Sequence, residues 1–469
     1  MRTRIFLTLT FGIVAVAVLV PTPNALPALV PATIHTVGSC GFFEHIQQAI
    51  DAAATGDDTE IRVQKDSTYV ENLDVPPTFS SGSITLTGGW ECSFLSRDDD
   101  PSNTTIDGGG AGSTLTVRLD GGSFTIMGFT ITNGLAERGG GIHIMPFGDS
   151  VTIIEDVRIV GNRAEDTDRA YGGGLTADLN GGERVEVDNV RIRNNQASSP
   201  TAVYGGGLYI ASNGSSEFLI EDSEIDENTA ESALGGIFGP GMDLSVAQTS
   251  SGLVVNTNVV DNTAIGDNVP ASGAYFKTNG SADLTVERWG MVFNSSTGVS
   301  AGPQLTIFSE GDSTFRMSDS GIAWGEGGVR ATSRDSAVLH LVNLTVADTI
   351  AGIDLIQYSG SVLTLYNTIA FGNDSNLTTS GTIDTGSNLI GVDPLFLNSE
   401  GLDYHLRSGS PAENAGDNNP PGGLGSTDFD GNPRIKDGVV DIGMFEGIAE
   451  IFHDGFESGN TSAWSDTVP

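Results

Sequence analysis

The chain has few cationic residues and few prolines. Its 469 residues include 21 lysines and arginines against 60 aspartates and glutamates, which gives a formal net charge of −39. Nucleic acids and anionic membranes are bound through clustered lysine and arginine, so this charge argues against nucleic acid as a partner. Glycine is abundant at 63 residues, but only 18 prolines and no Gly-X-Y period accompany it, which excludes collagen.

Long apolar runs are absent after the first residues of the chain. Residues 1–28 have the pattern of an export signal, in which two arginines precede an apolar run from Ile5 to Val20 and small residues follow. The run of about 16 residues is short for a membrane span, which needs roughly 20. We therefore expect a signal peptide, a secreted or cell-surface protein, and no transmembrane segment in the mature chain.

Cysteine is nearly absent as well, because only Cys40 and Cys92 occur. A single pair of cysteines in an exported chain usually forms a disulfide. Two lone cysteines offer too few ligands for a closed metal site. We therefore predict a Cys40–Cys92 disulfide that ties the first segment to an early strand.

What the chain does have is a repeat. Triple glycines begin at Gly139, Gly172 and Gly205, 33 residues apart. An Asn-x-Ala marker keeps nearly the same interval at Asn162, Asn195, Asn228 and Asn262. Self-similarity at such a period indicates one supersecondary unit stacked many times, in which each unit buries its apolar face against its neighbours.

Alignment of the repeats shows short strands that are separated by sharp bends. Apolar and polar residues alternate around each bend, and an Asp or Asn, which tolerates the left-handed backbone conformation, interrupts the alternation. Arg288 and Asn388 take the same place in two further coils. The bends are predicted to form a structural ladder of Asp156, Asn189, Asp222, Asn256, Asp319, Asn343 and Asn367.

These patterns predict an all-β, single-stranded right-handed parallel β-helix, a solenoid with an N-terminal capping helix and an irregular C-terminal cap. The N-terminal cap is expected at 33–83, where Ile46, Ala49, Ile50 and Ala53 share one face of an amphipathic helix. The β-helix follows at 84–392 and the C-terminal cap at 393–447. A tail at 448–469 is a candidate sorting tag.

Several motifs resemble known families. Ile46–Ala53, Tyr69–Leu73, Thr87–Trp90 and Ile106–Gly110 resemble secreted bacterial pectate-lyase-like β-helix proteins, and the glycine repeats resemble those of polymorphic outer-membrane proteins. The closing motifs are similar to the choice-of-anchor Q group, and they are Asn388–Gly391, Asp393–Phe396, Tyr404–Leu406, Gly409–Ala412, Asp430–Arg434 and Val440–Gly443. The resemblance implies a secreted or surface β-helix, in a group mostly without assigned chemistry.

One column of acids is the best candidate for chemistry. Glu155, Asp188 and Glu221 take the same place in three consecutive coils, and Ca²⁺ would offset their repulsion. Lyases of this fold combine Ca²⁺ with a cationic base, and the weak catalytic candidates on neighbouring positions are Arg158, Arg191 and Arg193. The simpler alternative is a set of solvated acids that are balanced by these arginines.

Two functions remain open from the sequence. The first is a non-enzymatic, monomeric β-helix protein that adheres to a surface or contacts a polysaccharide or cell-surface glycan, with no cofactor. The second is a Ca²⁺-dependent polysaccharide lyase, similar to pectate lyases, that acts on uronate polymers. Histidine does not favour either, because the six histidines are scattered without metal-type spacing.

Overall fold

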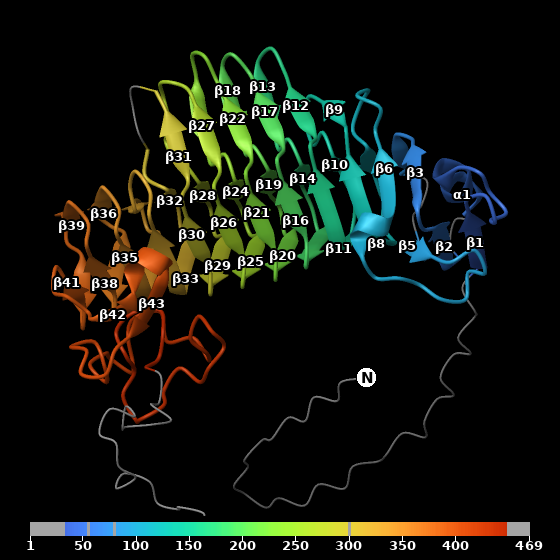
Figure 1. Ribbon diagram of the computed structural model, residues 1–469. Helices are drawn as coiled ribbons and strands as arrows, with labels where there is room; N and C mark the ends of the chain where they lie inside the picture. Colours follow the sequence, from blue (N-terminus) through green and yellow to red (C-terminus); the bar gives the residue numbers. More distant parts are fainter. Residues whose placement is uncertain (1–32, 54–56, 78–80, 299–301, 448–469) are drawn as a thin grey trace, which may run out of the picture.

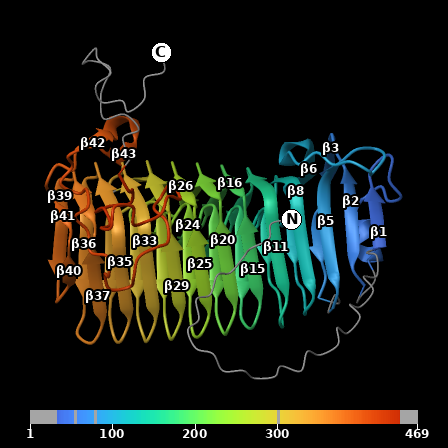
Figure 2. The ribbon, with the colours of Figure 1, turned by 90° about the horizontal axis from the view of Figure 1, so that it is seen from below.

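The computed structural model describes residues 33–53, 57–77, 81–298 and 302–447. The expected signal peptide at 1–28 and the tail at 448–469 lie outside these residues. The described chain forms an elongated rod of stacked coils (Figure 1), and the view from below shows the strands of successive coils side by side (Figure 2). Together the views show a right-handed parallel β-helix, so the predicted fold class is confirmed.

Four parallel sheets and one antiparallel pair account for the described strands. Sheet 1 has 21 strands: β1 (Thr33–Val37), β2 (Thr59–Gln64), β3 (Ser67–Val70), β5 (Ser83–Trp90), β6 (Thr104–Asp107), β8 (Ser123–Thr132), β11 (Val151–Val160), β15 (Arg184–Asp188), β16 (Arg191–Arg193), β20 (Glu217–Glu221), β21 (Glu224–Asp226), β25 (Ser251–Val255), β26 (Asn258–Val260), β29 (Asp283–Glu287), β30 (Gly290–Val292), β33 (Thr314–Ala323), β35 (Val338–Ala347), β37 (Val362–Tyr366), β38 (Ile369–Phe371), β40 (Asp384–Gly386) and β41 (Leu389–Ile390).

Sheet 2 has 11 strands: β4 (Leu73–Val75), β7 (Leu115–Val117), β10 (Ile142–Ile144), β14 (Leu175–Leu179), β19 (Leu208–Ser212), β24 (Met242–Val246), β28 (Ala274–Thr278), β32 (Leu305–Ser309), β34 (Val329–Ser333), β36 (Ala351–Gln357) and β39 (Ser375–Ser380). Sheet 3 has six: β9 (Leu135–Ala136), β12 (Arg163–Glu165), β17 (Gln196–Ser198), β22 (Thr229–Glu231), β27 (Thr263–Ile265) and β31 (Ser295–Thr297). Sheet 4 has three: β13 (Arg169–Tyr171), β18 (Ala202–Tyr204) and β23 (Gly236–Phe238).

The remaining elements are short. Strands β42 (Phe396–Asn398) and β43 (Asp403–Leu406) form the antiparallel pair. The helices are α1 (Ile46–Ala52) and two 3₁₀ turns at Pro101–Asn103 and Ser399–Gly401. Sheet 4 lies in the loops that project at the top of the rod (Figure 1).

Equivalent residues of successive coils pair in register. Ile154 pairs with Val187, which in turn pairs with Ile220. All three point inward and are at most 1% exposed. The alternation that was read from the sequence therefore produces one continuous apolar core, because each coil repeats the same inward positions.

The bend residues have the left-handed backbone conformation. In Asp156, Asn189, Asp222, Asn256, Asp319, Asn343 and Asn367, φ lies between +48° and +54°. Asn189 Nδ2 donates to Asp156 Oδ1, and Asn256 Nδ2 donates to Asp222 Oδ1. Alternation of acid and amide thus gives each exposed carboxylate a donor from the next coil. The last bend differs from the sequence reading: Ser387, with φ +49°, takes the left-handed conformation and Asn388 follows it.

A second ladder lies inside the rod, and the sequence analysis gave it no structural role. The marker asparagines are at most 1% exposed. The side-chain oxygens of Asn195, Asn228 and Asn262 each accept from the backbone N–H and the Nδ2 of the asparagine in the preceding coil, and that of Asn162 accepts from Gly134 N–H. This ladder runs through Asn162, Asn195, Asn228, Asn262 and Asn294 and ends at Gln304. The third glycine of each triple leaves room for it, because a Cβ on Gly207 would lie 2.7 Å from Asn228 Nδ2.

The N-terminal end is closed by helix α1, as predicted. Ile46, Ala49 and Ile50 are buried against the first coil. The Glu71 carboxylate accepts from the N–H groups of Ile46 and Gln47, both at 3.0 Å. Parallel pairing already begins with β1 and β2 at residue 33, before the expected boundary at 84.

The disulfide between Cys40 and Cys92 is present, with a Cα–Cα distance of 5.4 Å. It joins the turn that follows β1 to the loop that follows β5, 52 residues later. The prediction of this pairing from two lone cysteines in an exported chain is confirmed.

The irregular segment 393–447 lies on the flank of the last coils. In Figure 2 it crosses the sheet 1 strands β33 and β35. Arg316 donates to the carbonyl of Gly422, and Asn367 Nδ2 donates to the carbonyl of Asp417. The segment thus covers the bends of the late coils, while β39, at the end of sheet 2, keeps mostly exposed residues.

Candidate functional site

The acidic column is assembled as the repeat predicts. Glu155 pairs with Asp188 and Asp188 with Glu221, so the three carboxylates come from adjacent strands. Partial burial and nearby acids raise the pKa of both Glu155 and Asp188 above their usual values. Beside them lies a polar hollow of about 730 Å³, lined by Asp156, Asp188, Asn189, Asp222, Ser223, Glu224, Asn256 and Asn258.

A Ca²⁺ ion at this column stays a prediction from the sequence. Within the described residues, no group of three or more His, Cys, Asp or Glu side chains is arranged to hold one. The Asp156 and Asp222 carboxylates already accept from the amides of Asn189 and Asn256. The geometry therefore gives no support to a Ca²⁺ site at Glu155, Asp188 and Glu221.

Two of the three candidate arginines, Arg191 and Arg193, are engaged in ion pairs. Arg191 makes a two-point contact with Asp226, at 3.1 Å from Nε and 2.7 Å from Nη2, and Arg193 Nε donates to Glu227 at 3.0 Å. Asp226 raises the pKa of Arg191 still further. Arg158 lies in register with Arg191 on the preceding strand. A general base must release its proton, and these pairs hold the guanidinium of Arg191 charged.

A different set of residues gathers on the outer side of sheets 2 and 4. We call Tyr171, Tyr204, Tyr209, Phe238 and Tyr275 the aromatic patch. Tyr171, Tyr204 and Phe238 end the three strands of sheet 4 in register, and their rings stack in sequence at centroid distances of 5.0 and 4.9 Å. Each of the five side chains remains partly exposed. The patch thus follows the axis of the rod over successive coils.

The two sheets meet at this patch. The ring centroid of Tyr209 on β19 lies 5.0 Å from that of Tyr171 and 6.1 Å from that of Tyr204. The ring of Tyr275 on β28 packs edge-on against Phe238, with a centroid distance of 5.1 Å. Such pairs are worth about 0.5–1.5 kcal/mol each beyond their buried area. The rings therefore hold the projecting loops of sheet 4 against sheet 2.

One end of the patch is cationic. The Arg138 guanidinium lies 3.7 Å over the Tyr171 ring, and Asp178 holds it by two hydrogen bonds. His143 also contacts Asp178, at 3.2 Å. The arginine thus extends the column of stacked rings by one coil, and its charge is neutralised by the neighbouring carboxylate.

The sequence contains a signal for this patch that was not used. Tyr171 and Tyr204 each stand directly before a triple glycine, and Phe238 stands before the equivalent Gly-Pro-Gly. Arg138 occupies the same position in the preceding repeat. Attention to the residue before each glycine motif would have predicted a column of rings.

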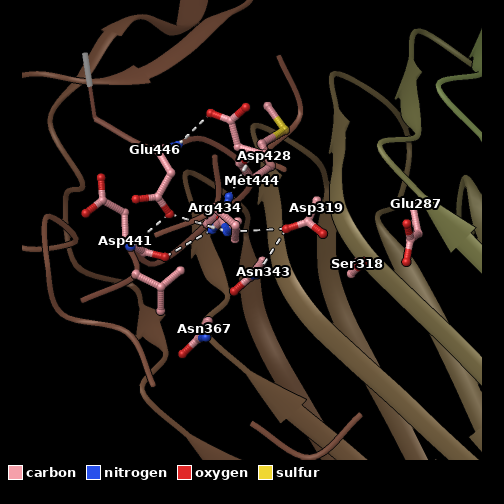
Figure 3. A network of polar contacts seen from close by, with 12 residues as sticks. Glu287, Ser318, Asp319, Asn343, Asn367, Asp428, Arg434, Asp441, Met444 and Glu446 are labelled. Carbon is pink, nitrogen blue, oxygen red and sulfur yellow. Dashed lines mark hydrogen bonds and ion pairs between the residues drawn. The ribbon is translucent and has the colours of Figure 1, made fainter. Parts of the chain in front are cut away.

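A buried ionic cluster joins the C-terminal segment to sheet 1 (Figure 3). Arg434 is 2% exposed, and its Nε lies 3.4 Å from both Asp319 of β33 and Glu446. Its Nη atoms donate to the carbonyls of Asp441, Gly443 and Met444. Burial raises the pKa of Asp319 and of Asp441, because it disfavours the charged carboxylate, and the Arg434 guanidinium opposes this rise.

We expect this cluster to weaken at alkaline pH. Burial raises the pKa of Glu446 to about 8; Asp441 and Asp428 add to this effect and Arg434 opposes it. A carboxyl with a raised folded-state pKa stabilises the fold below its unfolded pKa of 4.5, and that stabilisation is lost as pH rises through about 8. Glu446→Gln should therefore stabilise the segment at pH 9 by about 2–3 kcal/mol relative to wild type and change little at pH 5.

Limited proteolysis of the segment, with denaturant titration at both pH values, measures this effect. Glu413→Gln, an exposed acid of the same segment, is the matched control and should show no such difference. An equal loss of stability of wild type and Glu446→Gln between pH 5 and pH 9 would show that ionisation of Glu446 does not weaken the cluster.

Comparison with known proteins identifies no family for this chain. No family model matches the chain, and no curated protein matches it. Among solved structures, the crystal structure of pectate lyase Pel9A is similar with a TM-score of 0.40 and 14% identity, over 86% of this chain and 90% of that one. The pectin methylesterase from carrot gives 0.33 and 13%, over 74% and 88%. The assignment of the fold therefore rests on the strand pairing of the chain itself.

Proposed function

We propose that the protein is an extracellular, non-enzymatic β-helical rod that binds a neutral polysaccharide along the aromatic patch. The observation that carries the proposal is the column of partly exposed rings from Tyr171 through Tyr204 to Phe238, which follows the rod axis at about 5 Å per coil. An extended glycan advances by a similar step per sugar, and the stacked rings, whose faces cover one another, present their edges to its apolar C–H groups. Sites for such ligands combine aromatic walls with a few polar groups.

Charge favours a neutral ligand. The net charge of −39 repels uronate polymers at a distance. At the patch, the charge of Arg138 is already neutralised by Asp178. Arg169, on the same strand as Tyr171, lies 3.8 Å from the Asp168 carboxylate. A polyanionic sugar would therefore meet cations that already face a carboxylate, whereas a neutral sugar meets no repulsion.

The lyase alternative has less support. Arg191 and Arg193 both face the buried Asp226, and no described group of ligands suits Ca²⁺. Incubation with polygalacturonate and calcium should accordingly release no unsaturated uronate. Release of such product, lost in Arg191→Ala, would instead establish the lyase.

An extracellular location fits the disulfide. Within the described residues, no helix has the length and hydrophobicity of a membrane span. Attachment to the bacterial surface rests on the sequence alone, through the export signal, the resemblance of the repeats to polymorphic outer-membrane proteins, and the resemblance of the closing motifs to the choice-of-anchor Q group.

Affinity electrophoresis in gels that contain a soluble glucan, xylan, mannan or polygalacturonate tests the binding function. We expect at least one neutral polymer to retard the protein, and Tyr204→Ala to weaken binding by about tenfold, as for an aromatic hot spot. Tyr358→Ala, a 55% exposed tyrosine away from the patch, should bind like wild type. Retardation by no neutral polymer, or equal retardation of Tyr204→Ala, would refute the proposal.

A further inference from the structure

Asp243 is the one acid on the outer face of β24, and it is almost completely buried. Met242, Leu244 and Val246 point into the core, so Asp243 and Ser245 point outward. Nevertheless Asp243 is only 2% exposed. The residues in register on either side are Tyr209 and Tyr275, both members of the aromatic patch. Asp243 therefore lies at the centre of the patch, between its tyrosines.

The carboxyl of Asp243 has an oxygen without a partner. Oδ2 is shielded from solvent and has no hydrogen bond within the described residues. Burial raises the pKa of Asp243 well above its usual value. Burial also raises the pKa of Tyr209 and brings that of Tyr275 to about 12, and the Asp243 carboxyl adds to both effects. The groups that face it are these two phenols and that of Tyr204. None of them donates to it.

Such a group is costly for folding. A buried polar atom without a partner costs about 1–3 kcal/mol, and an ionised carboxylate costs more. A leucine, which has the same branched shape, would occupy this place without that cost. Other buried acids among the described residues have partners: Asp226 and Asp319 face an arginine, and Glu183 and Asp428 accept from backbone N–H groups. Asp243 faces aromatic rings instead.

We infer that Asp243 is the polar centre of the aromatic patch and hydrogen-bonds a hydroxyl of the bound neutral sugar. This inference rests on the proposed function and deepens it, because it names the group that selects the ligand. A protonated carboxyl both donates and accepts, as a sugar hydroxyl does, and the surrounding rings cover the apolar C–H groups. An acidic sugar would place a second carboxyl against a buried one and is rejected.

The test compares Asp243→Asn, Asp243→Leu and wild type by isothermal titration with cellohexaose, xylohexaose and mannohexaose, and by thermal unfolding. We expect Asp243→Asn, which keeps a donor and an acceptor, to stay within about threefold of wild-type affinity, and Asp243→Leu to lose at least about tenfold. The unfolding temperature of Asp243→Leu should equal or exceed that of wild type. A merely structural acid would not move binding and stability in opposite directions.

A matched control is Thr152→Val on β11, outside the patch. This substitution also removes a buried polar atom without a hydrogen-bond partner, the Thr152 hydroxyl. It should leave affinity unchanged. If wild type binds a hexaose, Tyr204→Ala weakens it and Asp243→Leu does not, the patch binds sugar and the role of Asp243 is refuted. If wild type binds none of the three, the proposed function and this inference both fail. An ionised Asp243 at pH 7, seen by carbon NMR of labelled aspartate, would overturn the inference without reference to any sugar.

Discussion

Replacement of Asn228 by leucine should unfold several coils at once. The Asn228 Oδ1 accepts from Asn195 N–H at 2.9 Å and Asn195 Nδ2 at 3.0 Å, while its Nδ2 donates to the carbonyl of Ile192 and to Asn262 Oδ1. Leucine leaves these buried groups without partners at a cost of about 1–3 kcal/mol each, so we expect a loss of about 3–5 kcal/mol. Guanidinium titration measures it.

Asn228→Asp separates hydrogen bonding from volume. Aspartate has the same shape, but it turns the donor that faces the carbonyl of Ile192 into an acceptor, so it should be nearly as harmful as leucine. The control is Asn256→Gly on the exposed ladder, because glycine adopts the φ of +48° without strain and should cost less than about 1 kcal/mol. Similar losses of unfolding free energy at both positions would show that the interior ladder stabilises the fold no more than the exposed one.

The fold could be predicted because the residues that determine the strands and bends recur at a regular interval in the sequence. Inward positions such as Ile154 and Val187 recur at one interval, and bends such as Asn189 carry residues that accept a positive φ. Both signals are local, because each can be recognised within one strand or one bend of the sequence. Stacking follows from the period, because equal intervals bring equal residues into register.

The site could not be predicted in the same way, because its meaning depends on which residues face each other across coils. The acids Glu155 and Asp188 recur as regularly as the rings of Tyr171 and Tyr204. The environment of each pair depends on residues from other coils, which the repeat pattern does not show. The burial of Asp243 follows from rings on both adjacent strands and on sheet 4. The sequence shows it merely as an acid within an alternating strand.

Removal of Arg434 should release the C-terminal segment while the coils stay folded. Arg434→Met leaves the carboxyls of Asp319 and Glu446, and three carbonyls, buried without their cation. Loss of one partner from a buried ion cluster costs about 3–5 kcal/mol. Because coils hold each other only through neighbours, the loss should stay local, on the flank that the segment covers.

Hydrogen exchange read by mass spectrometry distinguishes local release from global unfolding. In Arg434→Met, peptides from 410–447 and from the covered strands β33 and β35 should lose protection, while peptides from β15 and β20 keep theirs. Lys436→Met is the matched control, since that exposed side chain donates to the carbonyl of Gly447 at 3.3 Å and has no ion pair among the described residues. Uniform loss of protection along the rod would mean that the segment unfolds together with the coils. Unchanged protection at 410–447 would mean that apolar contacts, through Met444 and Phe445, hold the segment instead of Arg434.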